Sequence, residues 1–219
     1  MAALDATDFT ALRHRMIEAD LRGRGISDPR VLMAMAEVPR EEFVPEALRD
    51  EAYDDRALPI GFHQTISQPF TVAFMLEALG LRSGDQVLEI GTGSGYAAAV
   101  MSQLVTTVHT VERIPELAQS AQRRLQRLGY RNVHVHVGDG SLGLAEYGPF
   151  DVIVVTAAAE VLPPEFAKQL ADGGRMVLPL GDSYSQSLYR FTKDGERLVS
   201  EDLGGFMFVP LIGRHGRVR

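Results

Sequence analysis

The chain has 219 residues, of which 45% are hydrophobic and none is cysteine, and its formal net charge is −7 at pH 7. This length and apolar content are enough for one sizeable domain with its own core. The lack of cysteine excludes disulfides, thiolate nucleophiles and cysteine-ligated zinc, and the acidic balance gives no general attraction to nucleic acid. Because no run of about eighteen apolar residues occurs, we expect no membrane-spanning helix and a cytoplasmic protein.

The first eighty residues predict helices followed by a polar loop. The Asp28-Pro29 pair predicts the start of a helix that continues over Val31–Val38. The stretch after Leu58 is expected to be an extended loop, and Phe70–Leu79 a helix that ends at Gly80. An earlier helix is indicated by apolar residues that share one face: Phe9, Leu12, Met16 and Ile17.

A buried strand at Val87–Ile90 leads directly into a turn with three glycines at alternate positions, and residues 96–104 predict the helix that follows. Gly91, Gly93 and Gly95 let the backbone approach a ligand closely, and the helix N-terminus adds free N–H groups and a positive dipole end. This arrangement is typical of α/β proteins that bind nucleotide-like cofactors.

The glycine spacing indicates which cofactor. Dinucleotide-binding loops have the pattern Gly-x-Gly-x-x-Gly, and phosphate-binding loops have a Lys-Ser or Lys-Thr pair that is missing here. S-adenosylmethionine remains, since it carries an adenosine but no phosphate. The next strand, over residues 107–111, ends at Glu112, where a carboxylate can accept hydrogen bonds from ribose hydroxyls. Glu112 alone would more simply be a solvated strand end, but its position after the glycine loop favours the ribose role.

Beyond this loop the apolar runs alternate between strands and helices, which predicts a doubly wound, mostly parallel α/β sheet. The last three runs have no long helices between them and predict an antiparallel edge. This is the plan of a class I, Rossmann-like methyltransferase with N-terminal helices. The expected elements are strands at 108–111, 133–137, 152–155, 176–180, 187–192, 198–203 and 206–211, and helices at 115–128 and 164–170.

We expect residues 1–219 to form a single methyltransferase domain with three segments. Residues 1–80 would hold the N-terminal helices and an active-site loop, 81–185 the cofactor-binding core, and 186–219 the C-terminal strands and tail. No metal site is expected, because His134 and His136 share one face of a strand without further ligands at metal-binding spacing.

A series of motifs in order along most of the chain goes beyond a general cofactor fold. They are Leu58-Pro59-Ile60-Gly61, Gln64-Thr65-Ile66-Ser67-Gln68-Pro69-Phe70, Glu89-Ile90-Gly91-Thr92-Gly93-Ser94-Gly95-Tyr96, Val111-Glu112-Arg113, Gly138-Asp139-Gly140, Phe150-Asp151-Val152-Ile153, Thr156-Ala157-Ala158, Gly173-Gly174-Arg175, Leu178-Pro179 and Phe208-Val209-Pro210-Leu211. In this order they resemble the protein-L-isoaspartate O-methyltransferase family of bacterial type. A glycine loop alone is weak evidence, whereas its combination with the Thr-Ile-Ser-Gln-Pro segment is specific.

The resemblance implies transfer of a methyl group from S-adenosylmethionine to the free α-carboxylate of L-isoaspartyl residues, with S-adenosylhomocysteine as the product. The esters so formed collapse to succinimide and allow repair. Partners would be damaged proteins and peptides, with no nucleic acid or membrane, and the protein would be a monomer or weak homo-oligomer. A methyltransferase for another carboxylate or small molecule is the first alternative, a non-catalytic cofactor-binding module the second, and a nucleotide-dependent oxidoreductase a distant third.

The resemblance also implies roles for individual residues. Ser67 matches the active-site serine, and Thr65, Ile66 and Gln68 surround it in a loop over the cofactor. Ile212 stands where some relatives carry a hydroxyl residue, which removes any polar contact there. The cofactor residues implied are Thr65, Ile66, Gln68, Glu89, Gly91, Thr92, Gly93, Gly95, Glu112, Arg113, Asp139, Gly140 and Thr156, and those for substrate are Ile66, Ser67, Val209, Pro210 and Leu211.

This reaction needs no general base. An α-carboxyl group has an ordinary pKa of about 3.3–3.7 and is already ionised at neutral pH, so catalysis reduces to placing it in line with the departing sulfur. The Ser67 hydroxyl can donate an orienting hydrogen bond. Glu89 lies within an apolar strand, and a buried carboxylate needs partners, which loop N–H groups or the cofactor's ammonium group would supply.

Overall fold

The computed structural model describes residues 7–217, so the outermost parts of the two expected terminal segments, 1–6 and 218–219, lie outside it. Seven strands form one sheet in the order β5-β4-β3-β6-β7-β8-β9. The first five strands in this order are parallel, and β8 and β9 pair antiparallel at the edge, as the sequence predicted. Their bounds are β3 (Gln86–Ile90), β4 (Thr107–Glu112), β5 (Val133–Val137), β6 (Phe150–Val155), β7 (Leu170–Gly181), β8 (Gln186–Asp194) and β9 (Arg197–Gly205).

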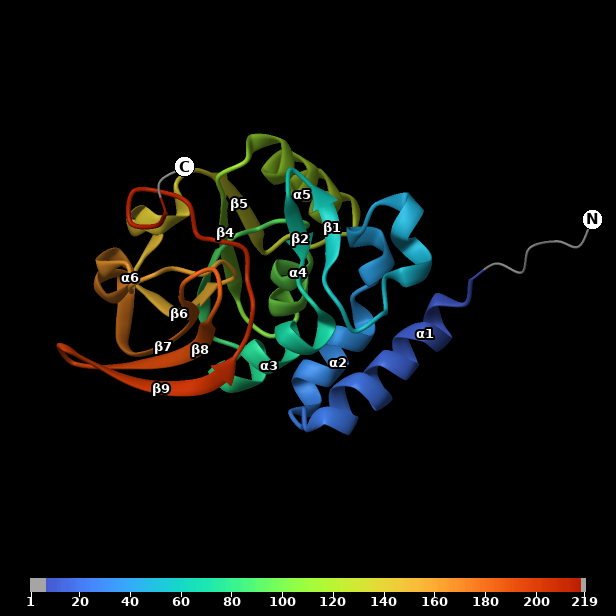
Figure 1. Ribbon diagram of the computed structural model, residues 1–219, viewed down its shortest axis with the longest axis horizontal. Coiled ribbons are helices and arrows are strands. Elements are labelled where there is room, and N and C mark those ends of the chain that lie inside the picture. The colour runs from blue at the N-terminus through green and yellow to red at the C-terminus, as the bar shows by residue number, and fades with distance from the viewer. Residues whose placement is uncertain (1–6, 218–219) are drawn as a thin grey trace, which may run out of the picture.

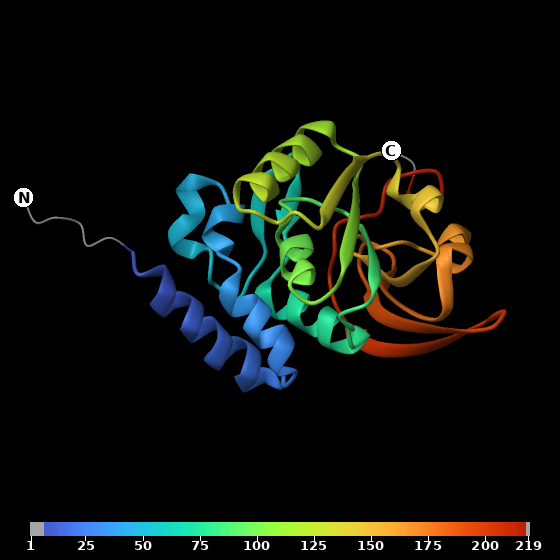
Figure 2. The same ribbon diagram turned by 180° about the vertical axis from the view of Figure 1, so that it is seen from behind.

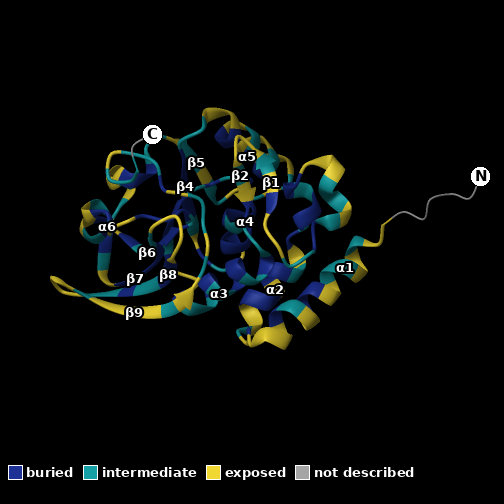
Figure 3. Cartoon of the chain, viewed as in Figure 1, coloured by how far each residue is buried: buried dark blue, intermediate teal, exposed yellow. Residues whose placement is uncertain are grey.

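The sheet separates two hydrophobic cores, because successive side chains of a strand point to opposite faces. Val87 packs into the core formed with the N-terminal region, α3 (Pro69–Leu79) and α4 (Tyr96–Ser102). Leu88, the next residue, packs into the core on the other face, which α6 (Pro164–Gln169) covers. The central strands are therefore buried on both sides (Figure 3), which explains their continuous apolar runs.

Helices and short turns of helix precede the sheet. Asp8 caps α1 (Phe9–Arg15) and Asp28 caps α2 (Pro29–Glu37), each by accepting backbone N–H groups of the first turn. Figure 1 shows these helices at one end of the molecule and the β8–β9 ribbon at the other, and Figure 2 shows α5 (Pro115–Arg127) at the top, between these two ends. The remaining short elements are η1 (Met16–Leu21), η2 (Arg22–Arg24), η3 (Arg40–Phe43), η4 (Glu46–Glu51), η5 (Gly140–Leu142) and η6 (Ala145–Tyr147).

Two local expectations are wrong. The segment after Leu58 is not a loop but a hairpin of β1 (Leu58–Gly61) and β2 (Gln64–Ile66), which turns at Phe62 and His63 with positive φ at both residues. Residues 206–211 do not form a strand along the sheet edge. They cross to the end of β6, where Ala158 exchanges backbone hydrogen bonds with Val209 and Leu211 around Pro210, which has no N–H to offer a neighbouring strand.

Three histidines of the edge strand β5 and its neighbour β4 form a stack. The ring of His109 lies 5.1 Å from that of His134 and 5.3 Å from that of His136, with Tyr147 closing the stack. Among residues 7–217 no group of three or more His, Asp or Glu side chains is arranged to hold a metal ion. Within the same range, no helix is long and apolar enough to cross a membrane.

Candidate active site

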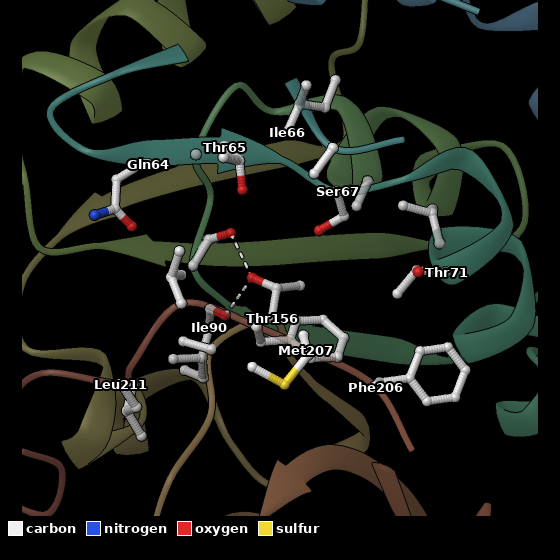
Figure 4. Close-up of a pocket in the computed structure, with 18 of the residues that line it drawn as sticks. Gln64, Thr65, Ile66, Ser67, Thr71, Ile90, Thr156, Phe206, Met207 and Leu211 are labelled. Carbon is white, nitrogen blue, oxygen red and sulfur yellow. Dashed lines mark hydrogen bonds between the residues drawn. The ribbon is translucent and has the colours of Figure 1, made fainter. Parts of the chain in front are cut away.

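A cavity of about 720 Å³ opens where β3, β4 and β6 end at their carboxyl side. This is the edge at which α/β sheets bind ligands. Three segments far apart in the sequence line it: the hairpin and the residues after it (64–72), the glycine loop with the ends of its neighbouring strands, and residues 205–212. Figure 4 shows Ser67 and Thr65 on one side of the cavity, and Thr156, Met207 and Leu211 on the other.

The first glycine of the loop is required by a contact with β6. Gly91 has φ of 102°, and a Cβ atom there would lie 2.3 Å from the hydroxyl of Thr156. That hydroxyl donates to the carbonyls of Ile90 and Gly91, 3.0 Å from each (Figure 4). Thr156 therefore ties the residue after β6 to the end of β3, and only glycine at position 91 leaves room for its hydroxyl.

The second glycine is tied to the acidic residue at the end of β4. The Gly93 N–H donates to one carboxylate oxygen of Glu112 at 3.0 Å, and the Ile114 N–H donates to the other oxygen, also at 3.0 Å. Each oxygen retains a lone pair, so Glu112, which lines the cavity, can still accept a hydrogen bond from a ligand hydroxyl. A Cβ atom at Gly93 would lie 3.3 Å from Ile60, which brings the hairpin against the loop.

Glu89 lines the same cavity and is 0% exposed. One carboxylate oxygen accepts a hydrogen bond from the Thr110 hydroxyl at 2.5 Å, and the other is buried without a partner among the described residues. Burial raises the pKa of Glu89 to about 8; the Thr110 hydrogen bond acts against this rise and the neighbouring Glu112 adds to it. None of these contacts is a hydrogen bond from a loop N–H to Glu89, which was one of the two expected kinds of partner. The unpartnered oxygen of Glu89 is therefore available to a ligand.

Two predicted cofactor residues are not among those that line the cavity. Gly95 faces α5, where a Cβ atom would lie 3.2 Å from Leu125. The Asp139 carboxylate accepts hydrogen bonds from Ser141 and from the backbone N–H of Arg214. Burial alone would raise the pKa of Asp139, but these hydrogen bonds outweigh it and lower the pKa. Asp139 thus anchors the C-terminal segment, while its neighbour Gly140 lines the cavity.

The Ser67 segment joins β2 to α3. The helix is not capped by Ser67: Asp55 accepts the backbone N–H of Phe70 at 3.0 Å, and it also binds the side-chain amide of Gln68 at 2.8 Å. The Gln68 side chain is further engaged by the Thr71 hydroxyl. No capping role therefore holds the Ser67 hydroxyl, which faces the cavity (Figure 4).

The structure brings together nearly all the predicted site residues. Those that line the cavity are Thr65, Ile66, Ser67, Gln68, Glu89, Gly91, Thr92, Gly93, Glu112, Arg113, Gly140, Thr156, Val209, Pro210, Leu211 and Ile212. Several other lining residues were missed from the sequence because they lie outside the motifs given above: Arg24, Thr71, Tyr184, Gln186, Phe206 and Met207. Two of them, Tyr184 and Met207, are 92% and 66% exposed, and this exposure is visible only in the structure.

The chemistry of the lining residues fits S-adenosylmethionine. The ligand that fits has an ammonium group and ribose hydroxyls but no phosphate. The buried, unpartnered oxygen of Glu89 suits the ammonium group, and the free lone pairs of Glu112 suit the hydroxyls. The glycine backbone at Gly91, which leaves no room for a Cβ atom, allows close approach. The fold and this cavity together define a class I, S-adenosylmethionine-dependent methyltransferase.

Comparisons with known proteins identify the family within that class. The sequence pattern of the protein-L-isoaspartate(D-aspartate) O-methyltransferase family matches residues 12–216. The chain is 55% identical over 206 residues to protein-L-isoaspartate O-methyltransferase 2 of Pelobacter propionicus. The aligned residues cover 93% of this chain and 92% of the relative. It is also 55% identical over 208 residues to protein-L-isoaspartate O-methyltransferase of Roseiflexus castenholzii, across 95% of both chains. The chain belongs to the protein-L-isoaspartate(D-aspartate) O-methyltransferase family.

Solved structures agree with this assignment. A protein-L-isoaspartate O-methyltransferase superimposes with a TM-score of 0.84 at 34% identity, covering 93% of this chain and 67% of the other. A family member from Plasmodium falciparum, determined in complex with S-adenosyl-L-homocysteine, gives a TM-score of 0.81 at 27% identity and covers 94% of this chain and 99% of its own. The resemblance expected from the motifs is therefore confirmed.

Proposed function

We propose that this protein methylates the free α-carboxylate of L-isoaspartyl residues in damaged proteins and peptides, with S-adenosylmethionine as the methyl donor. Membership of the family supports the activity. The observation that carries it in this chain is the convergence of the Ser67 hydroxyl with the glycine loop and the Glu89 carboxyl on one cavity. Because the lining residues come from all three segments, 1–80, 81–185 and 186–219, we further propose that they act as one domain.

The cofactor would lie along the ends of β3 and β4. The unpartnered oxygen of Glu89 would accept its ammonium group, and the remaining lone pairs of Glu112 would accept ribose hydroxyls. Gly91, Thr92 and Gly93 would pass beneath it, with Gly140 at the far end. Gly95 and Asp139 would act indirectly, Gly95 by admitting α5 against the loop and Asp139 by holding the C-terminal segment beside Gly140.

S-adenosylmethionine supplies the methyl group and leaves as S-adenosylhomocysteine. The reaction would join a substrate carboxylate oxygen to the methyl carbon while the electron pair of the broken bond went to sulfur, so that no proton would be gained or lost. The task of the chain is placement: Ser67 donates a hydrogen bond to the carboxylate, and the backbone beside Val209, Pro210 and Leu211 holds the substrate chain. Apolar lining from Ile66 and Leu211 excludes water, which favours the neutralisation of opposite charges.

The test uses two peptides that differ only in L-isoaspartyl or L-aspartyl at one position, each incubated with methyl-labelled S-adenosylmethionine. We expect base-labile label on the isoaspartyl peptide alone. Label on both peptides would point to a different carboxylate specificity, and label on neither would refute the proposal. We further propose that the protein is cytoplasmic and is a monomer or weak homo-oligomer, and size-exclusion chromatography with light scattering measures its oligomeric state.

A further inference from the structure

Arg40 is a fully buried arginine that none of the motifs above includes. Its side chain is 0% exposed, and among residues 7–217 it forms no ion pair with a carboxylate. Burial of an unpaired guanidinium costs free energy, and an apolar side chain of similar volume would avoid that cost. Stability alone therefore does not explain an arginine at this position.

The contacts of Arg40 point to the Ser67 segment. Its Nη2 donates to the backbone carbonyl of Ser67 at 2.7 Å, and its Nε donates to the carbonyl of Ala52, also at 2.7 Å. The guanidinium lies 4.7 Å from the ring centroid of Tyr96, the first residue of the helix that follows the glycine loop. One rigid, planar group thus joins the backbone of Ser67, the end of η4 and the start of α4.

This geometry determines where the Ser67 hydroxyl lies. The neighbours of Ser67 on the α3 side are held by Asp55, through the Phe70 N–H and the Gln68 amide. The hydrogen bond seen at Ser67 itself among the described residues is the one from Arg40 to its carbonyl. Holding this carbonyl restrains the Ser67 backbone, which sets the direction of its Cβ atom and leaves the hydroxyl only a few staggered positions over the cavity.

We propose that Arg40 is a positioning residue for methyl transfer, which orients the Ser67 hydroxyl against the glycine loop through the Ser67 carbonyl and the Tyr96 ring. The inference rests on the proposed function, since it assigns Arg40 a part in the same reaction. Arg40 is not among the residues that line the cavity, so it would act through Ser67.

The test is a double-mutant cycle between Arg40→Met and Ser67→Ala, with kcat, KM and S-adenosylhomocysteine affinity measured for each protein. Because misplacement by about 1 Å can cost about 100-fold in rate, we expect Arg40→Met to lower kcat by about 100-fold, with affinity changed less than about threefold. In the Ser67→Ala background the same change should lower kcat by less than about threefold, since its target is gone. Arg40→Lys, which reaches one carbonyl at a time, should fall between Arg40→Met and the wild type.

Arg175→Met is the matched control. Arg175 is another largely buried arginine that donates to backbone carbonyls, those of Leu79 and Gly80, but it pairs with Asp85, and neither residue of this pair lines the cavity. We expect it to lose thermal stability with little change in kcat. Should Arg40→Met fail to fold, Arg40→Lys carries the same cycle.

Equal losses of kcat in both backgrounds, or a parallel loss of cofactor affinity, would overturn the positioning role and leave Arg40 as a structural residue. An inactive wild-type protein would refute the proposed function itself, and with it this inference. An active wild type with additive mutations would refute the inference alone.

Discussion

Replacement of Glu89 by glutamine should make the protein more stable and its cofactor binding weaker. The buried carboxyl has a single protein partner, Thr110, and its second oxygen has none among the described residues. Its pKa rises from 4.5 to about 8 because burial disfavours the charged form. Glutamine has the shape of the protonated carboxyl and can keep the Thr110 hydrogen bond, so it removes the ionisation cost and little else.

The magnitude follows from the two pKa values. The unfolded chain ionises Glu89 above its ordinary pKa of 4.5, whereas the folded protein keeps it largely protonated up to about 8. The stability conferred by the protonated form is fully present below pH 4.5 and is lost as the pH rises toward 8. At about 1.4 kcal/mol per pH unit, Glu89→Gln should raise the free energy of unfolding by about 3 kcal/mol at pH 7. Below pH 4.5, where the folded and unfolded chains both carry a protonated Glu89, the substitution should change the free energy of unfolding very little.

Urea unfolding of both proteins at about pH 5 and about pH 7 measures this difference, and calorimetry measures S-adenosylhomocysteine binding. Loss of a hydrogen bond to a charged group should weaken binding by about 10- to 100-fold. Binding to the wild type at pH 7 should also release close to one proton, because the ligand's ammonium group stabilises the carboxylate, and the variant should release none.

Glu41→Gln is a control of opposite sign. Glu41 is also buried, but it accepts hydrogen bonds from Arg13 and Tyr53, so its neutralisation should destabilise the fold by about 1–3 kcal/mol. The reasoning about Glu89 is wrong if Glu89→Gln binds S-adenosylhomocysteine as tightly as the wild type, or if its effect on unfolding does not grow between the two pH values.

Three further predictions follow from the site and the histidine stack. Ser67→Ala should lower kcat by about 100-fold and leave S-adenosylhomocysteine affinity within about threefold, and a collapse of that affinity would assign Ser67 a structural role. Gly91→Ala should destabilise the protein by about 3 kcal/mol and weaken cofactor binding, because its Cβ atom would overlap the Thr156 hydroxyl. Gly129→Ala, with positive φ but open space, should cost only about 1 kcal/mol, and equal losses in thermal unfolding would contradict the steric account. Burial, together with the charges of His134 and His136, lowers the pKa of His109 from 6.5 to about 4. The stability that the neutral His109 ring contributes to the fold is therefore fully present above pH 6.5 and is lost as the pH falls toward 4. His109→Gln should therefore flatten the acid side of the stability profile, and an unchanged slope in urea unfolding would refute this.

Local pattern and backbone conformation were enough to predict the strand, glycine turn and helix of the cofactor half. The expected strand at 133–137 coincides with β5, and the expected helix end at Gly80 is a glycine with positive φ. Such features are readable because each depends on residues close together in the chain. The motifs around Ser67 and Gly91 likewise predicted the family, which the comparisons confirm.

Tertiary structure alone decided which residues share the cavity. Gly95 and Asp139 stand in the right motifs, yet one faces α5 and the other binds the C-terminal segment. The hairpin was missed because three- and four-residue strands give too short an alternation to recognise. Arg40 gave no signal at all, since its role depends on the Ser67 carbonyl 27 positions away. A sequence records which groups a chain carries, whereas long-range packing determines which of them meet.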